Sequence, residues 1–442
     1  MIIVAWFIFL SLGLVCGKYF YPHIKQRSRL FLITYLIASV FMFLFHWYAV
    51  YNLKISYSLE KLGAFSPDGA FYHEAGAIRS TRLTNPMIIK QGSWTIAWQY
   101  VIAVLYRIFG VNTIYPKIFN VFCFSIAAIA FMNLSFLVSN SLRTARRSYW
   151  MFTFFIPLLY YNGTMLRETF MAFLVIMIVY FFAMLWKNRH LKWIILFIVA
   201  SLSLFLTRAE LMLIIGVLIL ITFVLGLRIS ISRKIAYGLI CVLVFGFFSS
   251  LSFVKETEII DTITGEGGRN RYVKASTTEK KVVTGGYLDY AIVVASSPLL
   301  YTKAIISGTL GFFLNPLPNK FLQKRNYMKF NNYFFCSLYN VYFYLLLPAI
   351  FFGVYFKLKL KVFNHLDFII VLTVLLMMTA ISLNMRDPLR YRTPVFGFLL
   401  LYASHGISLF KYWEKYIGLI IVIMCAGALF FTLFFDVKSL VS

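Results

Sequence analysis

Cysteine is scarce in this chain of 442 residues, and its spacing excludes two kinds of stabilising site. The five cysteines mostly fall inside apolar runs, and none of them forms a CxxC or CxxH pair. Zinc sites and disulfide frameworks are built from closely spaced cysteines and histidines of this kind. We therefore expect buried, inert thiols in place of a zinc site or a disulfide-linked domain.

A basic domain that stands apart from the apolar runs is also missing. The chain has 42 Lys and Arg against 15 Asp and Glu, a net charge of +27, and in a soluble protein such an excess indicates nucleic-acid binding. Here the basic residues lie between apolar runs. Cytoplasmic loops of membrane proteins carry such an excess, and anionic lipids attract it. We therefore expect membrane lipids as partners and no nucleic acid.

Long apolar runs are abundant. Hydrophobic residues make up 61% of the chain, compared with about 45–50% in soluble domains, and many runs can cross ~30 Å of hydrocarbon as helices. We predict an all-α fold, a single transmembrane domain over residues 1–442 with about 12 transmembrane helices. The first run has no basic region before it and no A-x-A cleavage site, so we expect a retained helix. The predicted spans are 2–17, 30–50, 116–139, 150–161, 168–186, 193–206, 211–227, 235–253, 336–356, 368–384, 393–410 and 416–435.

Basic residues between the spans predict the orientation of the bundle. Six short segments hold 18 of the 42 Lys and Arg residues: 18–29, 143–147, 187–192, 228–234, 357–361 and 411–415. Placing all six inside follows the positive-inside rule and puts both termini outside, with two large outer segments, 51–115 and 254–335. We expect the run 94–109 to lie as a helix at the outer interface, because Arg107 within a span would cost about 2.5–3.5 kcal/mol.

The positive-inside rule does not explain the ionisable residues at three tight outer turns, 162–168, 207–210 and 385–392. Such groups are expensive at membrane depth and tend to face a cavity. If they converge, they form a pocket for phosphate or pyrophosphate, whose oxygens a planar guanidinium binds in pairs. The alternative is that they reach the outer headgroups or form local ion pairs. The candidate outer arginines are Arg79, Arg82, Arg107, Arg167, Arg208, Arg386, Arg390 and Arg392.

The first outer segment holds the sharpest candidate for chemistry, Asp68. Pro67 and Gly69 flank it and favour a turn, and the residues from Phe71 onward predict a short helix. Asp68 would then lie at the N-terminus of that helix, where it acts chemically or only caps the helix. His73 is either a supporting group of the site or an interfacial residue. His and Asp are too few here to predict a metal site; a Mg²⁺ or Mn²⁺ ion at Asp68 and a second carboxylate stays open.

Four short motifs gain meaning from their order and from the side of the membrane on which they fall. They are Asp68 followed by Tyr72, Phe109-Gly110 before a long span, Leu166-Arg167-Glu168 at a tight outer turn, and Arg390-Tyr391-Arg392-Thr393-Pro394 entering a span. The pattern resembles the GT-C superfamily, polytopic membrane glycosyltransferases that use polyprenyl-phosphate-linked sugars, in a form that suits bacterial surface-polysaccharide synthesis. Two features depart from the family: a whole extra helix precedes the first-loop acid, and the large soluble C-terminal domain of some members is absent.

The resemblance implies a reaction and roles for these residues. Asp68 would be the general base that activates the acceptor hydroxyl, Glu168 would be the second acid, and the sugar would leave its polyprenyl phosphate with inversion. The outer arginines, with Tyr72 and His73, would bind the phosphate and the lipid-linked sugar. The acceptor would be a lipid-linked or surface glycan, and the active site would face the periplasm or exterior of a bacterial inner (plasma) membrane.

Two other functions stay open. A polymerase or ligase of polyprenyl-diphosphate-linked oligosaccharide repeats, of the O-antigen or capsule type, would also have about a dozen helices, and the basic residues of segment 254–335 suit it. A transporter or flippase of lipid-linked sugars is less favoured. Such proteins often show internal repeats and broken midplane helices, and the sequence shows neither.

Overall fold

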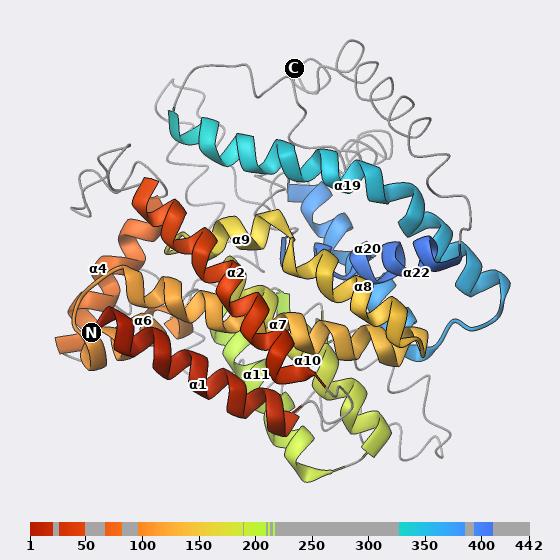
Figure 1. Ribbon diagram of the computed structural model, residues 1–442, viewed down its shortest axis with the longest axis horizontal. Coiled ribbons are helices and arrows are strands. Elements are labelled where there is room, and N and C mark those ends of the chain that lie inside the picture. Colours follow the sequence, from red (N-terminus) through yellow and green to blue (C-terminus); the bar gives the residue numbers. More distant parts are fainter. Residues whose placement is uncertain are drawn as a thin grey trace, which may run out of the picture.

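The described part of the chain is helical throughout. The computed structural model describes residues 1–20, 26–48, 67–81, 96–188, 190–208, 211–212, 215–216, 327–384 and 393–409, and within these ranges no strand occurs. The helices are α1 (Ile2–Phe20), α2 (Arg27–Trp47), α4 (Pro67–Thr81), α6 (Ile96–Phe109), α7 (Ile114–Ser139), α8 (Leu142–Thr153), α9 (Ile156–Asn162), α10 (Glu168–Asn188), α11 (Leu191–Thr207), α19 (Tyr327–Lys359), α20 (His365–Asn384) and α22 (Leu399–Leu409), shown in Figure 1. The predicted all-α class is therefore confirmed for these residues.

Three helices are long and apolar enough to cross a membrane: Arg27–Trp47, Ile114–Ser139 and Glu168–Leu185. They match three of the predicted spans, as expected for a helical membrane protein. Shorter apolar helices cover Ile2–Lys18, Ala97–Phe109, Leu191–Thr207 and His365–Leu375. The total of about 12 crossings stays a prediction. The predicted spans 235–253 and 416–435 lie outside the described residues, as does most of 211–227 and of the segment 254–335.

The predicted span 150–161 is wrong as a single helix. A helix begins earlier, at Leu142, because the side chain of Ser141 accepts a hydrogen bond from the backbone N–H of Thr144 and caps it. This helix, α8, ends at Thr153, and α9 starts anew at Ile156 with Pro157 in its first turn. Proline has no N–H to donate and clashes with the preceding turn, so the helix cannot continue through it.

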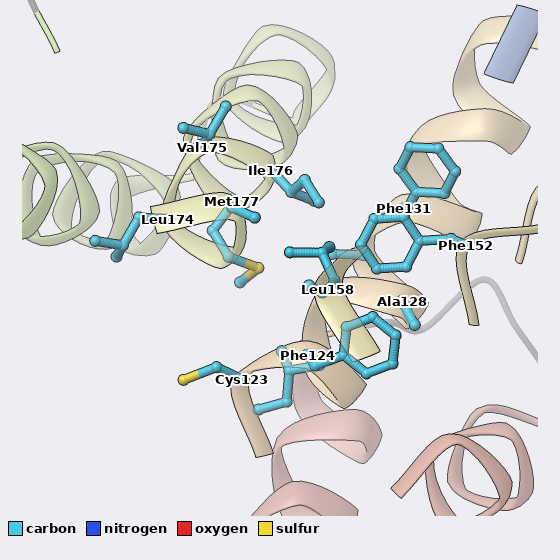
Figure 2. Packing of buried hydrophobic residues seen from close by; sticks show 14 of the residues in the cluster. Cys123, Phe124, Ala128, Phe131, Phe152, Leu158, Leu174, Val175, Ile176 and Met177 are labelled. Atoms are coloured by element: carbon cyan, nitrogen blue, oxygen red, sulfur yellow. The ribbon is translucent and has the colours of Figure 1, made fainter. Parts of the chain in front are cut away.

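The core lies where α7, α8, α9 and α10 meet. Phe131 of α7 stacks on Phe152 of α8 with ring centroids 4.7 Å apart, and Phe124 lies 5.5 Å from the same ring. Figure 2 shows Leu158 of α9 beside this aromatic group, and Met177 of α10 belongs to the same buried cluster. Because lipid tails are as apolar as these side chains, close packing is what holds such a core together.

Contacts between helix ends define two ends of the bundle. At one end, Lys117 Nζ at the start of α7 lies 3.0 Å from His46 Nδ1 at the end of α2. We call this the α4–α6 end, after the two helices that lie there near the N-terminus, on the left of Figure 1. At the other end, the α8–α20 end, Lys357 Nζ of α19 donates to the carbonyl of Val138 in α7 (2.7 Å), and Arg147 of α8 donates to a serine of α22. The predicted inner segments 143–147 and 357–361 therefore share one end.

Candidate functional site

Helix α4 places Asp68 in its first turn. The helix runs from Pro67 to Thr81, so the short helix predicted after the Pro-Asp-Gly turn is confirmed. Proline suits the first position because its missing N–H would have no partner there. A carboxylate in the first turn is favoured by the helix dipole. The local sequence thus suffices to hold Asp68 at the start of α4.

Helix α4 is joined to α6 by two polar contacts. His73 Nδ1 lies 2.7 Å from the hydroxyl of Tyr106, with the two rings edge to face. Farther along, Arg79 Nε donates to Gln99 Oε1 at 3.1 Å. Burial lowers the pKa of His73, and the nearby Glu74 carboxylate only partly opposes this. His73 is therefore neutral at neutral pH and can share a proton with the Tyr106 hydroxyl.

The turn before α10 is tied to three other helices. Trp98 Nε1 of α6 donates to the carbonyl of Met165 (3.0 Å), and Asn120 Nδ2 of α7 donates to the next carbonyl, that of Leu166 (3.2 Å). Arg167 Nη1 then donates to the carbonyl of Thr207 at the end of α11 (2.6 Å). Two predicted outer turns, 162–168 and 207–210, therefore touch each other, and helix α6 lies against the first of them.

Glu168 is the first residue of α10, and its side chain is fully buried. Aromatic rings pack together two residues farther along α10, where the ring centroid of Phe170 lies 5.5 Å from that of Trp98 and 5.9 Å from that of Phe119. This end of the bundle therefore combines a buried acid with a cluster of aromatic rings, Trp98, Phe119 and Phe170.

Neither a protein-family model nor a curated protein matches this chain. Inference about function therefore rests on residue chemistry and geometry.

The structure separates the predicted outer arginines by environment. Arg79 is buried between α4 and α6, whereas Arg107, on the same helix pair, is exposed. Arg167 is half-buried and bonded to the backbone of α11, and Arg208 caps the end of that helix. Tyr72 is buried on α4. The remaining candidates, Arg82, Arg386, Arg390 and Arg392, lie outside the described residues.

Three buried polar residues at this end were not singled out from the sequence. Lys117 and Asn120 lie one turn apart on α7, and Asn162 ends α9; all three side chains are almost fully buried. Neither polar atom of the Asn162 amide has a hydrogen-bond partner in the described part of the chain. The sequence does hold a signal for Lys117 and Asn120. They are two polar residues three positions apart on an otherwise apolar helix, a spacing that places both side chains on one face.

No metal centre can be assembled from the described residues. Among them, no group of three or more His, Cys, Asp or Glu side chains could hold a metal ion. The sequence left open a divalent ion bound by Asp68 and a second carboxylate. No such group among the described residues supplies that second carboxylate, and the side chain of Asp68 lies outside the described part of the chain.

The α8–α20 end corrects the sequence-based interpretation of Lys357. The positive-inside rule treats it as one of many charges in an inner segment, but its side chain is buried. Its Nζ donates to both carboxylate oxygens of Asp367, at 2.7 and 2.6 Å, and the Tyr402 hydroxyl donates to the same carboxylate at 3.1 Å. A buried lysine needs such a partner because an unpaired charge is very costly in an apolar interior.

Proposed function

We propose that this protein is a membrane glycosyltransferase that moves a sugar from a polyprenyl-phosphate-linked donor to a lipid-linked or surface glycan on the outer face of a bacterial plasma membrane. The observation that supports this best is the hydrogen bond from Trp98 to the Met165 carbonyl. It joins the helix pair that carries Asp68 to the turn that carries Glu168. The two acids implied by the GT-C resemblance therefore lie on elements that α6 holds together.

Helix α6 makes this connection on both of its sides. Its Tyr106 bonds to His73 of α4, and its Trp98 packs on Phe170, two residues after Glu168. Rigid helices that fix their side chains by packing hold a catalytic arrangement better than loops do. The α4–α6–α10 arrangement thus suits a reaction that needs two acids and an acceptor in one orientation.

In the proposed mechanism, Asp68 accepts the proton of the acceptor hydroxyl as its oxygen attacks the anomeric carbon. The bond from that carbon to the phosphate oxygen breaks on the opposite side, so the configuration inverts and polyprenyl phosphate leaves. General base catalysis contributes roughly 10²–10⁴-fold. Glu168 orients the substrate, and guanidinium groups stabilise the charge that develops on the departing phosphate.

The test compares Asp68→Asn with a matched control on the same helix, Glu74→Gln. Purified full-length protein is given a polyprenyl-phosphate sugar and an acceptor, and transfer is followed by release of polyprenyl phosphate. We expect Asp68→Asn to lose roughly 10²–10⁴-fold in rate while its unfolding in detergent stays unchanged. Glu74→Gln should transfer at nearly the rate of the unmodified protein.

A parallel reaction offers a polyprenyl-diphosphate oligosaccharide in place of the monophosphate sugar. Consumption of the diphosphate substrate alone, with Asp68→Asn as active as the unmodified protein, would replace the proposal with the repeat-unit polymerase or ligase. Movement of labelled lipid across vesicles without any sugar transfer would favour a flippase instead.

A further inference from the structure

Arg79 is a buried cation whose environment is incomplete without an anion. Its side chain is 1% exposed. Nε donates to Gln99 Oε1, and the guanidinium lies over the ring of Tyr100, 4.9 Å from its centroid. Among the described residues, the buried Nη2 atom has no hydrogen-bond partner, and no carboxylate forms an ion pair with Arg79.

The neutral contacts of Arg79 do not balance its charge. A guanidinium stays protonated in proteins, and burying it away from water is very unfavourable unless an opposite charge accompanies it. Arg79 lies in the last turn of α4, where the helix dipole supplies only about half of a negative charge. The Tyr100 ring adds a cation–π attraction, which is also weaker than a full ion pair.

Exposed apolar side chains lie on the same two helices. Ile78 of α4 and Val104 and Ile108 of α6 are all exposed. A polar ligand alone would not need such a surface. An amphiphile would, because its hydrocarbon chain covers exposed apolar groups while its charged group reaches the buried cation.

We propose that Arg79, Gln99 and Tyr100 form a binding site for the phosphate group of an anionic lipid. The Nη2 edge of Arg79 donates to phosphate oxygens, for which a planar guanidinium is well shaped. Gln99 and Tyr100 are positioning residues: one holds Nε and the other holds the face of the guanidinium. The identity of the lipid as a polyprenyl phosphate rests on the proposed function, but the phosphate site itself rests on the contacts of Arg79.

The experiment measures binding by purified full-length protein in nanodiscs, followed by tryptophan fluorescence, to which Trp98, next to Gln99, contributes as one of 8 tryptophans. The probes are a polyprenyl phosphate, the matching polyprenol without phosphate, and inorganic phosphate as competitor. We expect at least tenfold tighter binding of the phosphate form, and competition by inorganic phosphate. Arg79→Gln should lower affinity for the phosphate form by about ten- to a hundredfold without changing affinity for polyprenol.

Three further variants separate recognition from folding. Arg146→Gln, at an exposed arginine on α8, should bind within twofold of the unmodified protein. Arg79→Lys keeps the positive charge but loses the planar guanidinium and its stacking on Tyr100. Gln99→Leu removes the acceptor that holds Nε of Arg79. Each of these two variants should weaken phosphate binding by a smaller factor than Arg79→Gln. Circular dichroism and detergent stability confirm that each variant is folded.

Equal affinity for polyprenol and polyprenyl phosphate would overturn the inference, and so would Arg79→Lys and Arg79→Gln variants that both bind like the unmodified protein. The outcome is independent of catalysis. Arg79-dependent binding without sugar transfer would leave the phosphate site standing and contradict the proposed function. Sugar transfer that is unaffected by replacing Arg79 would support the proposed function and contradict the phosphate site at Arg79.

Discussion

Replacing Asp367 by Asn tests how the α8–α20 end is held together. In the native protein, Lys357 Nζ has three acceptors, both oxygens of Asp367 and the carbonyl of Val138, all within 2.7 Å. The change removes the only carboxylate bonded to this ammonium in the described part of the chain. Asn keeps one oxygen acceptor, so the lysine stays buried with two neutral acceptors and no opposite charge.

Removing one partner of a buried ion pair costs about 3–5 kcal/mol. Because Val138 and the new amide oxygen still accept hydrogen bonds, we expect Asp367→Asn to destabilise the protein by about 3 kcal/mol, the lower end of this range. The double variant Lys357→Met with Asp367→Asn removes both charges and should be more stable than Asp367→Asn alone. The coupling in the double-mutant cycle should be about 2 kcal/mol.

The assay is unfolding of purified protein in mixed micelles by increasing SDS, followed by the reactivity of the buried thiol of Cys123 in a background in which the other cysteines are replaced by serine. Lys359→Met is the control, since Lys359 is exposed on the same helix and its ammonium lies over the Tyr355 ring in a cation–π arrangement. It should change stability by no more than about 0.5 kcal/mol. A cost below about 1 kcal/mol for Asp367→Asn, or strictly additive effects in the cycle, would show that the pair does not hold this end of the bundle.

Three other perturbations test the contacts around the site and the core. Trp98→Phe leaves the Met165 carbonyl without its N–H donor and should cost about 1 kcal/mol, with a fall in sugar transfer; unchanged unfolding and transfer would contradict the role given to α6. Burial lowers the pKa of His73. The unfolded chain therefore binds a proton at this histidine more readily than the folded protein, and stability should fall as the pH drops below about 6.5. A His73→Phe variant should lose this part of the pH dependence of unfolding, and an unchanged pH profile would contradict the prediction. Gly406→Leu drives a side chain into the backbone of Ala349 in α19 and should destabilise by about 1–3 kcal/mol, measured as a lower midpoint in the same SDS titration.

The sequence alone determined the elements that depend on local chemistry. The apolar run beginning at Glu168 is long enough to require a spanning helix, and α10 begins at that residue. The Pro67-Asp68-Gly69 turn similarly predicted the start of α4. The sequence also carries a signal for the break between α8 and α9, Pro157 in the first turn of α9, and the predicted span 150–161 took no account of it. Composition within one segment decides such features, because helix starts and ends depend on neighbouring residues.

Tertiary structure alone decided which charged residues are buried and with what they pair. Nothing in the sequence separates buried Arg79 from exposed Arg107, because burial depends on how α4 packs on α6. Lys357 resembled the other basic residues of its segment until Asp367, on the following helix, proved to be bonded to it. In an apolar interior a charge is stable only beside its partner, and the contact that supplies the partner forms only when separate helices pack together.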